Sequence, residues 1–140
     1  MIHYWHSRKN IKGRIYIPKY YDPSINDELE SKKDSHDLLN VQQLVDDGII
    51  SFGTGHEIGK LAYGTGDIPF VRTSDISNWE IKSAPKQGVS EEIYSEYALT
   101  QDVQVGDILL VRDGTYLIGT NCIVTALDKK ILYQSHILKI

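Results

Sequence analysis

The chain has 140 residues, of which 41% are hydrophobic and 24% charged, a composition typical of one folded domain with a hydrophobic core. Its single cysteine, Cys122, excludes an internal disulfide and predicts a reducing, cytoplasmic setting. The N-terminal residues lack the apolar run of a signal peptide, and no run approaches the length of a membrane span, so we expect no membrane partner.

The net charge of −4 is unevenly distributed. Residues 1–21 contain five Lys/Arg and no Asp/Glu, whereas residues 37–140 contain eight Lys/Arg and fourteen Asp/Glu. Non-specific binding to nucleic acids depends on neutralising phosphates, so the acidic larger part argues against strong binding of that kind. We predict a basic and aromatic N-terminal arm and linker over residues 1–36, followed by the main domain over residues 37–140.

Helix and turn signals dominate the first part of the chain. Residues 15–17 predict a short strand before a proline, and residues 22–24 predict a turn or a helix cap. A short charged helix or linker should follow over residues 25–33. A second helix is expected over residues 38–45, because its apolar residues recur at helical spacing. Ser35 or Asp37 is placed to cap that helix, and Gly48 to end it.

From residue 49 onwards, short apolar runs alternate with glycine-containing turns. One helix is predicted here, capped by Ser90 and with two glutamates in its first turn. A turn at residues 128–130 should join two of the strands as a hairpin. These features predict an α+β fold that is mainly β, with a small mixed or antiparallel sheet and a few short helices. Further strands are expected over residues 66–72, 79–81, 106–112, 121–126, 131–133 and 137–140. Because the chain stops inside the last of these strands, we expect the natural fold to continue beyond residue 140.

One pattern occurs twice and organises the main domain. Residues 66–72 and 106–112 share the sequence Gly-Asp-Ile-x-x-Val-Arg. In each copy the Gly-Asp pair predicts a turn, and the apolar run after it predicts a buried strand. Because side chains alternate along a strand, Arg72 and Arg112 should each share the core-facing side with the residues two and four positions earlier. We expect both copies to lie in one sheet, with the two arginines near the same edge.

Polar residues follow each arginine and predict a recognition surface. Arg72 precedes Thr-Ser-Asp at residues 73–75, and Arg112 precedes Asp-Gly-Thr-Tyr at residues 113–116. A guanidinium on the core side must be paired, or must lie where its strand leaves the core. Two such strand ends would form a polar rim on a β scaffold. The alternative is that the arginines pair with nearby carboxylates, such as Asp75 and Asp113, and only hold loops together.

The remaining motifs do not support catalysis. The glycine-rich residues 53–60 lack the spacing of a phosphate-binding loop or a dinucleotide fingerprint, which leaves a flexible loop whose Lys60 could contact a phosphate. The five histidines and the cysteine show no zinc-ligand spacing. Ser135 and His136 should point to opposite faces of a strand, so they form no hydrolytic pair. We therefore expect a binding module without catalytic residues, a metal ion or a cofactor of its own.

Taken in order, these segments resemble the target recognition domain of type I restriction–modification specificity subunits and of related N6-adenine DNA methyltransferases. The resemblance extends from about residue 38 to residue 140. Residues 14–21 are also similar to the segment that leads into such domains after a methyltransferase core. The motifs that carry the resemblance lie in residues 64–76, 89–92, 106–115 and 135–137.

The resemblance implies a DNA methylase specificity domain-like fold and a sequence-specific DNA-binding module whose loops read bases. A methyltransferase and, in many systems, a nuclease subunit would supply the catalysis. The Asn/Asp-Pro-Pro-Tyr signature of adenine methyltransferases is absent from this sequence, so S-adenosylmethionine is expected only on a partner or fused methyltransferase. The implied partners are double-stranded DNA, that methyltransferase subunit or domain, and in some systems a restriction subunit.

The candidate DNA-binding residues follow from their chemistry. Arg72 and Arg112 are candidates for guanine or phosphate contacts, because a planar guanidinium matches both. Hydroxyl and amide groups near them could bond to base edges or phosphates, and lysines could contact phosphates. The alternative for each lysine is an ordinary solvated side chain. These further candidates are Thr73, Ser74, Asn78, Thr115, Tyr116, Lys60, Lys82 and Lys86.

Two other functions stay open at this point. The acidic main domain also suits a protein-interaction module that docks a methyltransferase subunit while another domain reads DNA. One basic concave face would favour DNA binding, and uniform acidity would favour docking. A magnesium-dependent nuclease would require Asp75, Glu80 and Lys82 to converge, but the chain between Asp75 and Glu80 is short for the usual crossing of two strands.

Overall fold

The computed structural model describes residues 4–13, 15–77, 79–114, 116–128 and 130–140. The chain forms two separate compact units that divide after Asp46. The division lies later in the chain than the predicted end of the linker at residue 36. Among the residues described, no helix combines the length and the apolar character needed to cross a membrane.

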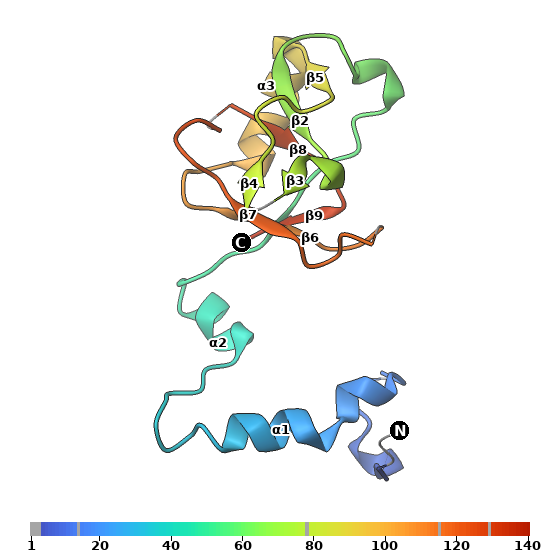
Figure 1. Cartoon of the computed structure of the whole chain (residues 1–140), viewed down its shortest axis with the longest axis vertical. Coiled ribbons are helices and arrows are strands. Elements are labelled where there is room, and N and C mark those ends of the chain that lie inside the picture. Colours follow the sequence, from blue (N-terminus) through green and yellow to red (C-terminus); the bar gives the residue numbers. More distant parts are fainter. Residues whose placement is uncertain (1–3, 14, 78, 115, 129) are drawn as a thin grey trace. The chain divides into compact units, whose positions relative to one another are not determined.

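The first unit, Met1–Asp46, contains short helices (Figure 1). None of its described residues is buried. The strand predicted over residues 15–17 is wrong, because Ile17 precedes a 3₁₀ helix and the Tyr21 hydroxyl donates to the carbonyl of Ile15 at 2.8 Å. Its elements are the 3₁₀ helices η1 (Arg8–Asn10) and η2 (Pro18–Tyr21) and the α-helices α1 (Pro23–Glu30) and α2 (Val41–Asp46).

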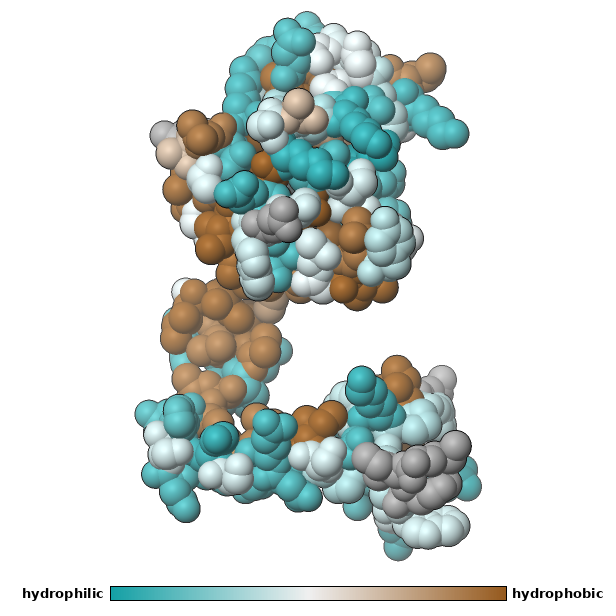
Figure 2. Space-filling view, viewed as in Figure 1, coloured by the Kyte–Doolittle hydropathy of each residue, from teal (hydrophilic) through white to brown (hydrophobic). Residues whose placement is uncertain are grey.

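Side-chain caps set the starts of both α-helices in this unit. The Asp22 carboxylate accepts a hydrogen bond from the amide of Ser24 at 3.0 Å, which confirms the predicted cap before α1. The Asn40 side chain accepts from the amide of Gln43 at 2.9 Å, so α2 begins later than predicted. The caps proposed further upstream are therefore wrong. Figure 2 shows hydrophobic side chains gathered around α2, where Val41 is exposed.

The second unit, Asp47–Ile140, contains the sheets (Figure 1). Its described part confirms the α+β class, with small, mainly antiparallel sheets and a few short helices. One sheet has the order β1 (Gly53–Thr54), β9 (Ile137–Lys139), β6 (Ile108–Val111) and β7 (Asn121–Ile123). Another has the order β5 (Gly88–Val89), β2 (Ile68–Val71) and β8 (Leu132–Tyr133), and β3 (Ile76–Ser77) pairs with β4 (Glu80–Ile81). The helices are η3 (Lys60–Ala62), η4 (Thr73–Asp75) and α3 (Glu91–Gln101).

The two copies of the repeated pattern form β2 and β6, as predicted, but they lie in different sheets. The expectation that they share a sheet is therefore wrong. Strand β2 pairs antiparallel with β5 and parallel with β8, whereas β6 pairs antiparallel with β7 and β9. The predicted hairpin turn at residues 128–130 is also wrong, because β7 and β8 belong to different sheets; its central residue, Lys129, lies outside the described residues. A local apolar pattern favours a strand without choosing its partner.

Strand β2 is buried on both faces and separates two hydrophobic clusters. Phe70 packs with Val89 and Leu132 in the cluster that α3 covers. Its neighbour Val71 points to the other face and packs in a second cluster that contains Tyr133. All five side chains are fully buried. This double burial makes β2 and β8 the centre of the second unit.

Helix α3 connects the core to the end of β8. It begins where predicted, with the Ser90 hydroxyl accepting from the amide of Ile93 at 3.5 Å. At its other end, the side-chain amide of the buried Gln101 bonds to the backbone of Tyr133. Its Nε2 donates to the Tyr133 carbonyl at 3.0 Å, and its Oε1 accepts from the Tyr133 backbone N–H at 2.9 Å. The side chain thus takes the place of a neighbouring strand and satisfies both backbone groups. This contact fixes the end of β8 just before residues 134–136.

Candidate nucleic-acid interface

The carboxyl ends of β2 and β6 reach the same short connection, residues 134–136, which joins β8 to β9. The amide of Gln134 donates to the carbonyl of Val71 at 2.9 Å, and the amide of Arg112 donates to the carbonyl of His136 at 2.9 Å. The arginines that follow the two strands therefore lie at opposite ends of this connection, although the strands belong to different sheets. We call the surface formed by Glu57, Arg72, Arg112, Asp113 and residues 134–136 the strand-end rim.

Acidic and basic side chains alternate across the strand-end rim. His136 Nδ1 is hydrogen-bonded to the Asp113 carboxylate, whose other oxygen accepts from Arg112 Nε at 2.7 Å. On its other side, His136 Nε2 lies 3.9 Å from Glu57 Oε1, which also accepts from the Ser135 hydroxyl. The hydrogen bond from His136, and then that from Arg112, hold the pKa of Asp113 below its ordinary value. The network orients the histidine and the arginine at the surface.

Arg112 lies on the outer face of β6, and not on the core side as predicted. Leu109 and Val111 are the buried residues of this strand, while Ile108 is 37% exposed. Arg112 therefore shares its face with the exposed residues and is itself exposed. Its pairing with Asp113 agrees with the alternative in which this arginine contacts a nearby carboxylate. Within the described residues, the terminal Nη nitrogens of Arg112 have no partner.

Arg72 is half-buried where β2 ends, and its guanidinium has no partner among the residues that the structure describes. Asp75 was the expected alternative partner, but it bonds to the backbone instead. The amide of Arg72 donates to Asp75 Oδ2 at 3.0 Å, and the amide of Asp75 donates to the carbonyl of Arg72 at 2.8 Å. This reciprocal pair closes helix η4 and leaves the Arg72 guanidinium able to bind an external acceptor.

The hydroxyl groups of η4 are not placed at the surface. Thr73 is only 7% exposed. Ser74 is half-buried as a residue, but its hydroxyl oxygen is itself buried and has no described partner. Lys82 is tied to η4, because its ammonium donates to the carbonyl of Ser74 and its amide to the carbonyl of Asp75 at 2.9 Å. Lys82 thus lies beside the turn that follows Arg72.

The other predicted contacts are placed apart from this network or are not described. Lys60 begins η3, and Lys86 lies between β4 and β5; both are exposed. Tyr116 is 96% exposed in the loop after Asp113. No described hydrogen bond connects these three side chains to the strand-end rim. Asn78 and Thr115 lie outside the described residues.

A cleft of about 790 Å³ opens beside the β3–β4 hairpin. Its lining includes the charged residues Glu80, Lys82, Asp128 and Lys130 and apolar side chains such as Ile131. Both acidic and basic groups therefore contribute to it. Such a lining does not favour one sign of ligand charge.

The acidic triad of a magnesium nuclease does not assemble. Asp75 is fully buried and places one carboxylate oxygen on the amide of Arg72, whereas Glu80 is exposed in the cleft. Lys82 meets Asp75 only through backbone groups. In the part of the chain that the structure describes, no three His, Cys, Asp or Glu residues are placed to hold a metal ion.

Sequence reasoning missed the roles of Glu57 and Asp113 as partners of His136. It also expected Ser135 and His136 to point to opposite faces, but both side chains approach Glu57. Glu57 comes from the loop after β1, and no local pattern connects it with residues so distant in the chain. Asp113 carried a usable signal, because a carboxylate directly after the repeated arginine is placed to pair with it.

The chain matches no family model, no curated protein and no solved structure. The resemblance to target recognition domains therefore enters the functional argument as a hypothesis, alongside the geometry of the strand-end rim.

Proposed function

We propose that this chain is a sequence-specific recognition module for double-stranded DNA that positions a methyltransferase on its target site. The observation that carries the proposal is the pair of arginines at the strand-end rim. Arg72 and Arg112 flank residues 134–136, and both retain guanidinium nitrogens without a described partner. A guanidinium donates two parallel hydrogen bonds to the edge of guanine or to a phosphate, which suits both base reading and docking.

The carboxylates of the strand-end rim support selective binding over general attraction. Glu57 and Asp113 lie beside the two cationic or protonatable groups Arg112 and His136. Negative charge next to an arginine reduces its attraction to any phosphate, while the hydrogen-bond geometry needed to read a base is kept. We therefore expect weak binding to random duplex DNA, and the part of the affinity that comes from phosphate contacts should decrease steeply with salt. The basic arm over residues 1–21 would supply attraction that does not depend on sequence.

Catalysis in this proposal belongs to a partner. A methyltransferase subunit or a fused methyltransferase domain would bind S-adenosylmethionine, and in some systems a restriction subunit would join the complex. The chain alone, incubated with S-adenosylmethionine or with magnesium and a plasmid, should leave the DNA unmodified and uncut. Methyl transfer or cleavage by purified chain, lost on substitution of Asp75 or Glu80, would contradict this assignment.

The test begins with selection of bound sequences from a pool of randomised duplexes, with the full chain and, in a second arm, with its methyltransferase partner. Fluorescence anisotropy then compares the selected duplex with a scrambled one over a series of salt concentrations. Arg72→Ala and Arg112→Ala should each weaken binding to the selected duplex by about 1–3 kcal/mol and change binding to the scrambled duplex little. Lys130→Ala removes the same charge from a side chain paired with Glu91, and serves as the control.

Equal losses on both duplexes for the two arginine variants would assign these residues to phosphate contacts or to structure. Arg8→Ala should weaken both duplexes alike, because it removes only general attraction. One observation favours the second candidate, the docking module: helix α3 exposes Glu91, Glu92 and Glu96 on the same unit. Failure to select any duplex, with or without the partner, would shift the assignment to docking.

A further inference from the structure

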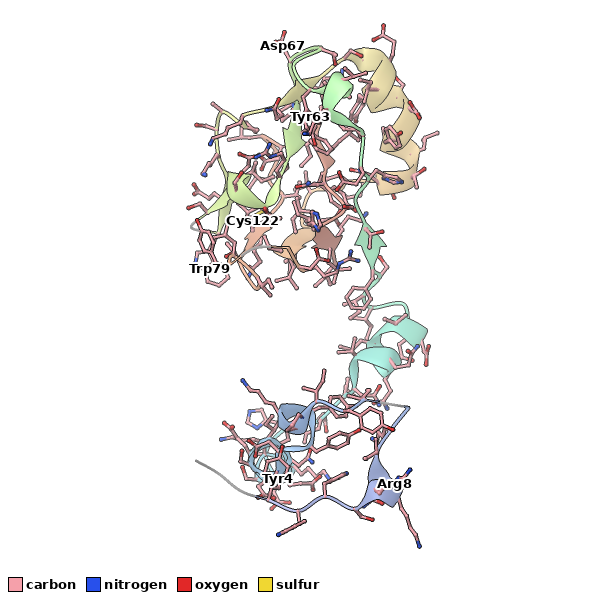
Figure 3. All side chains as sticks on the ribbon, turned by 90° about the vertical axis from the view of Figure 1, so that its right-hand side faces the viewer. Tyr4, Arg8, Tyr63, Asp67, Trp79 and Cys122 are labelled. Carbon is pink, nitrogen blue, oxygen red and sulfur yellow. The ribbon has the colours of Figure 1, made fainter. Side chains whose placement is uncertain are left out.

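Trp79 occupies the tip of the β3–β4 hairpin in a backbone conformation that tryptophan rarely adopts. Ser77 pairs with Glu80, so Trp79 lies where the chain passes from β3 to β4. Trp79 has a φ of 68°, in the left-handed region that favours glycine. Its side chain is 71% exposed, and Figure 3 shows it at the edge of the second unit. A large apolar ring therefore stands in water on a strained backbone.

The neighbouring strand holds this tip in place. The carbonyl of Trp79 accepts from the amide of Ile123 at 3.4 Å, and Trp79 forms an isolated bridge with the buried Cys122 of β7. The residue is thus fixed by its backbone, while its indole contributes little to the core. Strain that persists at an exposed side chain indicates a functional constraint, since a glycine or asparagine would fit the same turn without it.

A hollow of about 230 Å³ lies against Trp79 and is lined by Gly119, Thr120 and Asn121. The side-chain Nδ2 of Asn121 donates to the carbonyl of Gly119 at 3.2 Å, and this bond fixes the orientation of the Asn121 side-chain amide. Among the described residues, Asn121 Oδ1 and the Thr120 hydroxyl have no hydrogen-bond partner. The hollow is smaller than the pockets of about 300–1,000 Å³ that hold drug-sized ligands. An indole ring beside a fixed side-chain amide and a hydroxyl suits one planar ring system with polar edges.

We propose that this hollow binds a single unpaired nucleobase of a DNA strand, stacked on the Trp79 indole with its edge toward Asn121 and Thr120. The choice of DNA as the source of the base rests on the proposed function. Every base offers a π-face, so stacking on tryptophan tolerates any sequence. The amide and the hydroxyl add hydrogen bonds to the base edge. Trp79 would therefore hold a displaced strand, and the strand-end rim would read the duplex.

The chain has two tryptophans, so a Trp5→Phe background makes Trp79 the only fluorescent indole. Titration with a short single-stranded oligonucleotide, and with a duplex that carries one extrahelical base, should quench its emission. Trp79→Gly removes the indole and relieves the positive φ, so the protein should be at least as stable while its affinity for the single strand falls roughly 10-fold or more. Trp79→Phe should keep most of the affinity, and Asn121→Ala should lower it less than Trp79→Gly.

The outcomes separate this inference from the proposed function. Unchanged Trp79 emission at saturating single strand, together with full affinity of the Trp79→Gly variant, would overturn the inference even if Arg72→Ala loses its selected duplex. Quenching and loss in Trp79→Gly without any preference between duplexes would support the nucleobase site and overturn the proposed reading of sequence. Quenching by a methyltransferase subunit alone, with none by DNA, would assign Trp79 to a protein interface and overturn the inference.

Discussion

Strands β2 and β6 carry the same seven-residue pattern, yet their surroundings differ. In β2 the adjacent residues Phe70 and Val71 are both fully buried, because a hydrophobic cluster lies on each side of the strand. In β6 the buried residues are Leu109 and Val111, so one face forms the core and the other is open. A repeated local sequence can therefore specify a strand without specifying how many of its faces are covered.

The two arginines after these strands also differ in burial and in their partners. Arg72 leaves a strand that is covered on both faces, is itself half-buried, and has no described partner for its guanidinium. Arg112 leaves the open face of β6 and pairs with Asp113 and, through it, with His136. If both arginines read DNA, the contribution of Arg72 to the affinity should depend on the conformation of η4. The contribution of Arg112 should depend on the ionisation of Asp113.

The largest expected effect tests the difference in burial directly. Phe70 and Leu110 occupy equivalent positions of the two copies, but Phe70 is fully buried and Leu110 only partly. Phe70→Ala should lower the free energy of unfolding by about 3–5 kcal/mol, and Leu110→Ala by about 1–2 kcal/mol. Urea denaturation followed by circular dichroism measures both. Equal losses would show that β6 is covered on both faces, as β2 is.

The glycines at the start of the two copies should differ in which substitution, alanine or asparagine, destabilises the protein more. A Cβ on Gly66 would lie 2.6 Å from the carbonyl oxygen of Val89, whereas one on Gly106 would meet no atom within 4 Å. Gly106 instead has a φ of +103°, which strains other residues. At Gly66, asparagine should destabilise more than alanine, with losses of about 1–3 kcal/mol or more. At Gly106, asparagine should be tolerated better than alanine, since it accepts positive φ more readily. Thermal unfolding of the four variants would contradict this account if the order were the same at both sites.

The network of Asp113, His136 and Arg112 at the end of β6 should make the stability of the protein sensitive to acid. His136 and Arg112 lower the pKa of Asp113, so the carboxylate stabilises the fold when it is ionised. That contribution is present above the ordinary pKa of about 3.8 and is lost as the pH falls through the lower folded value. Asp113→Asn should therefore be less stable than the parent at neutral pH, with a difference that shrinks as the solution becomes acidic. Stability curves between neutral and acidic pH measure this, and a constant difference would exclude the carboxylate as the cause.

The smallest effect concerns Tyr133, which pairs with Val71 beside β2. Its hydroxyl is buried without a described partner, and burial raises the pKa of Tyr133 from 10.0 to about 12. Tyr133→Phe should be neutral or slightly stabilising at neutral pH, because it removes an unsatisfied polar group. The parent should lose stability as the pH rises above about 10 toward about 12, since the unfolded tyrosine ionises first. Tyr133→Phe should lose less over that range. A clear destabilisation at neutral pH would show that the hydroxyl is satisfied.

The features that could be predicted from the sequence are those that depend on short stretches of chain. The two apolar runs after Gly-Asp predicted β2 and β6, and Ser90 with the glutamates after it predicted the start of α3. The α+β class followed from the same signals. Each of these features is encoded within a few residues, by strand-forming side chains or by a cap whose hydroxyl bonds to the next turn.

The tertiary structure was needed to establish which strands pair and which charged side chains lie together. It placed β2 and β6 in different sheets, and yet brought their ends to the one connection at residues 134–136. It brought together Glu57 and His136, which lie near opposite ends of the second unit's sequence. It also kept Asp75 away from the cleft that Glu80 lines. These outcomes depend on which apolar faces are buried against each other, a property of the whole packed unit. No local spacing contains that information, because alternation along a strand is the same whether one face or two are covered.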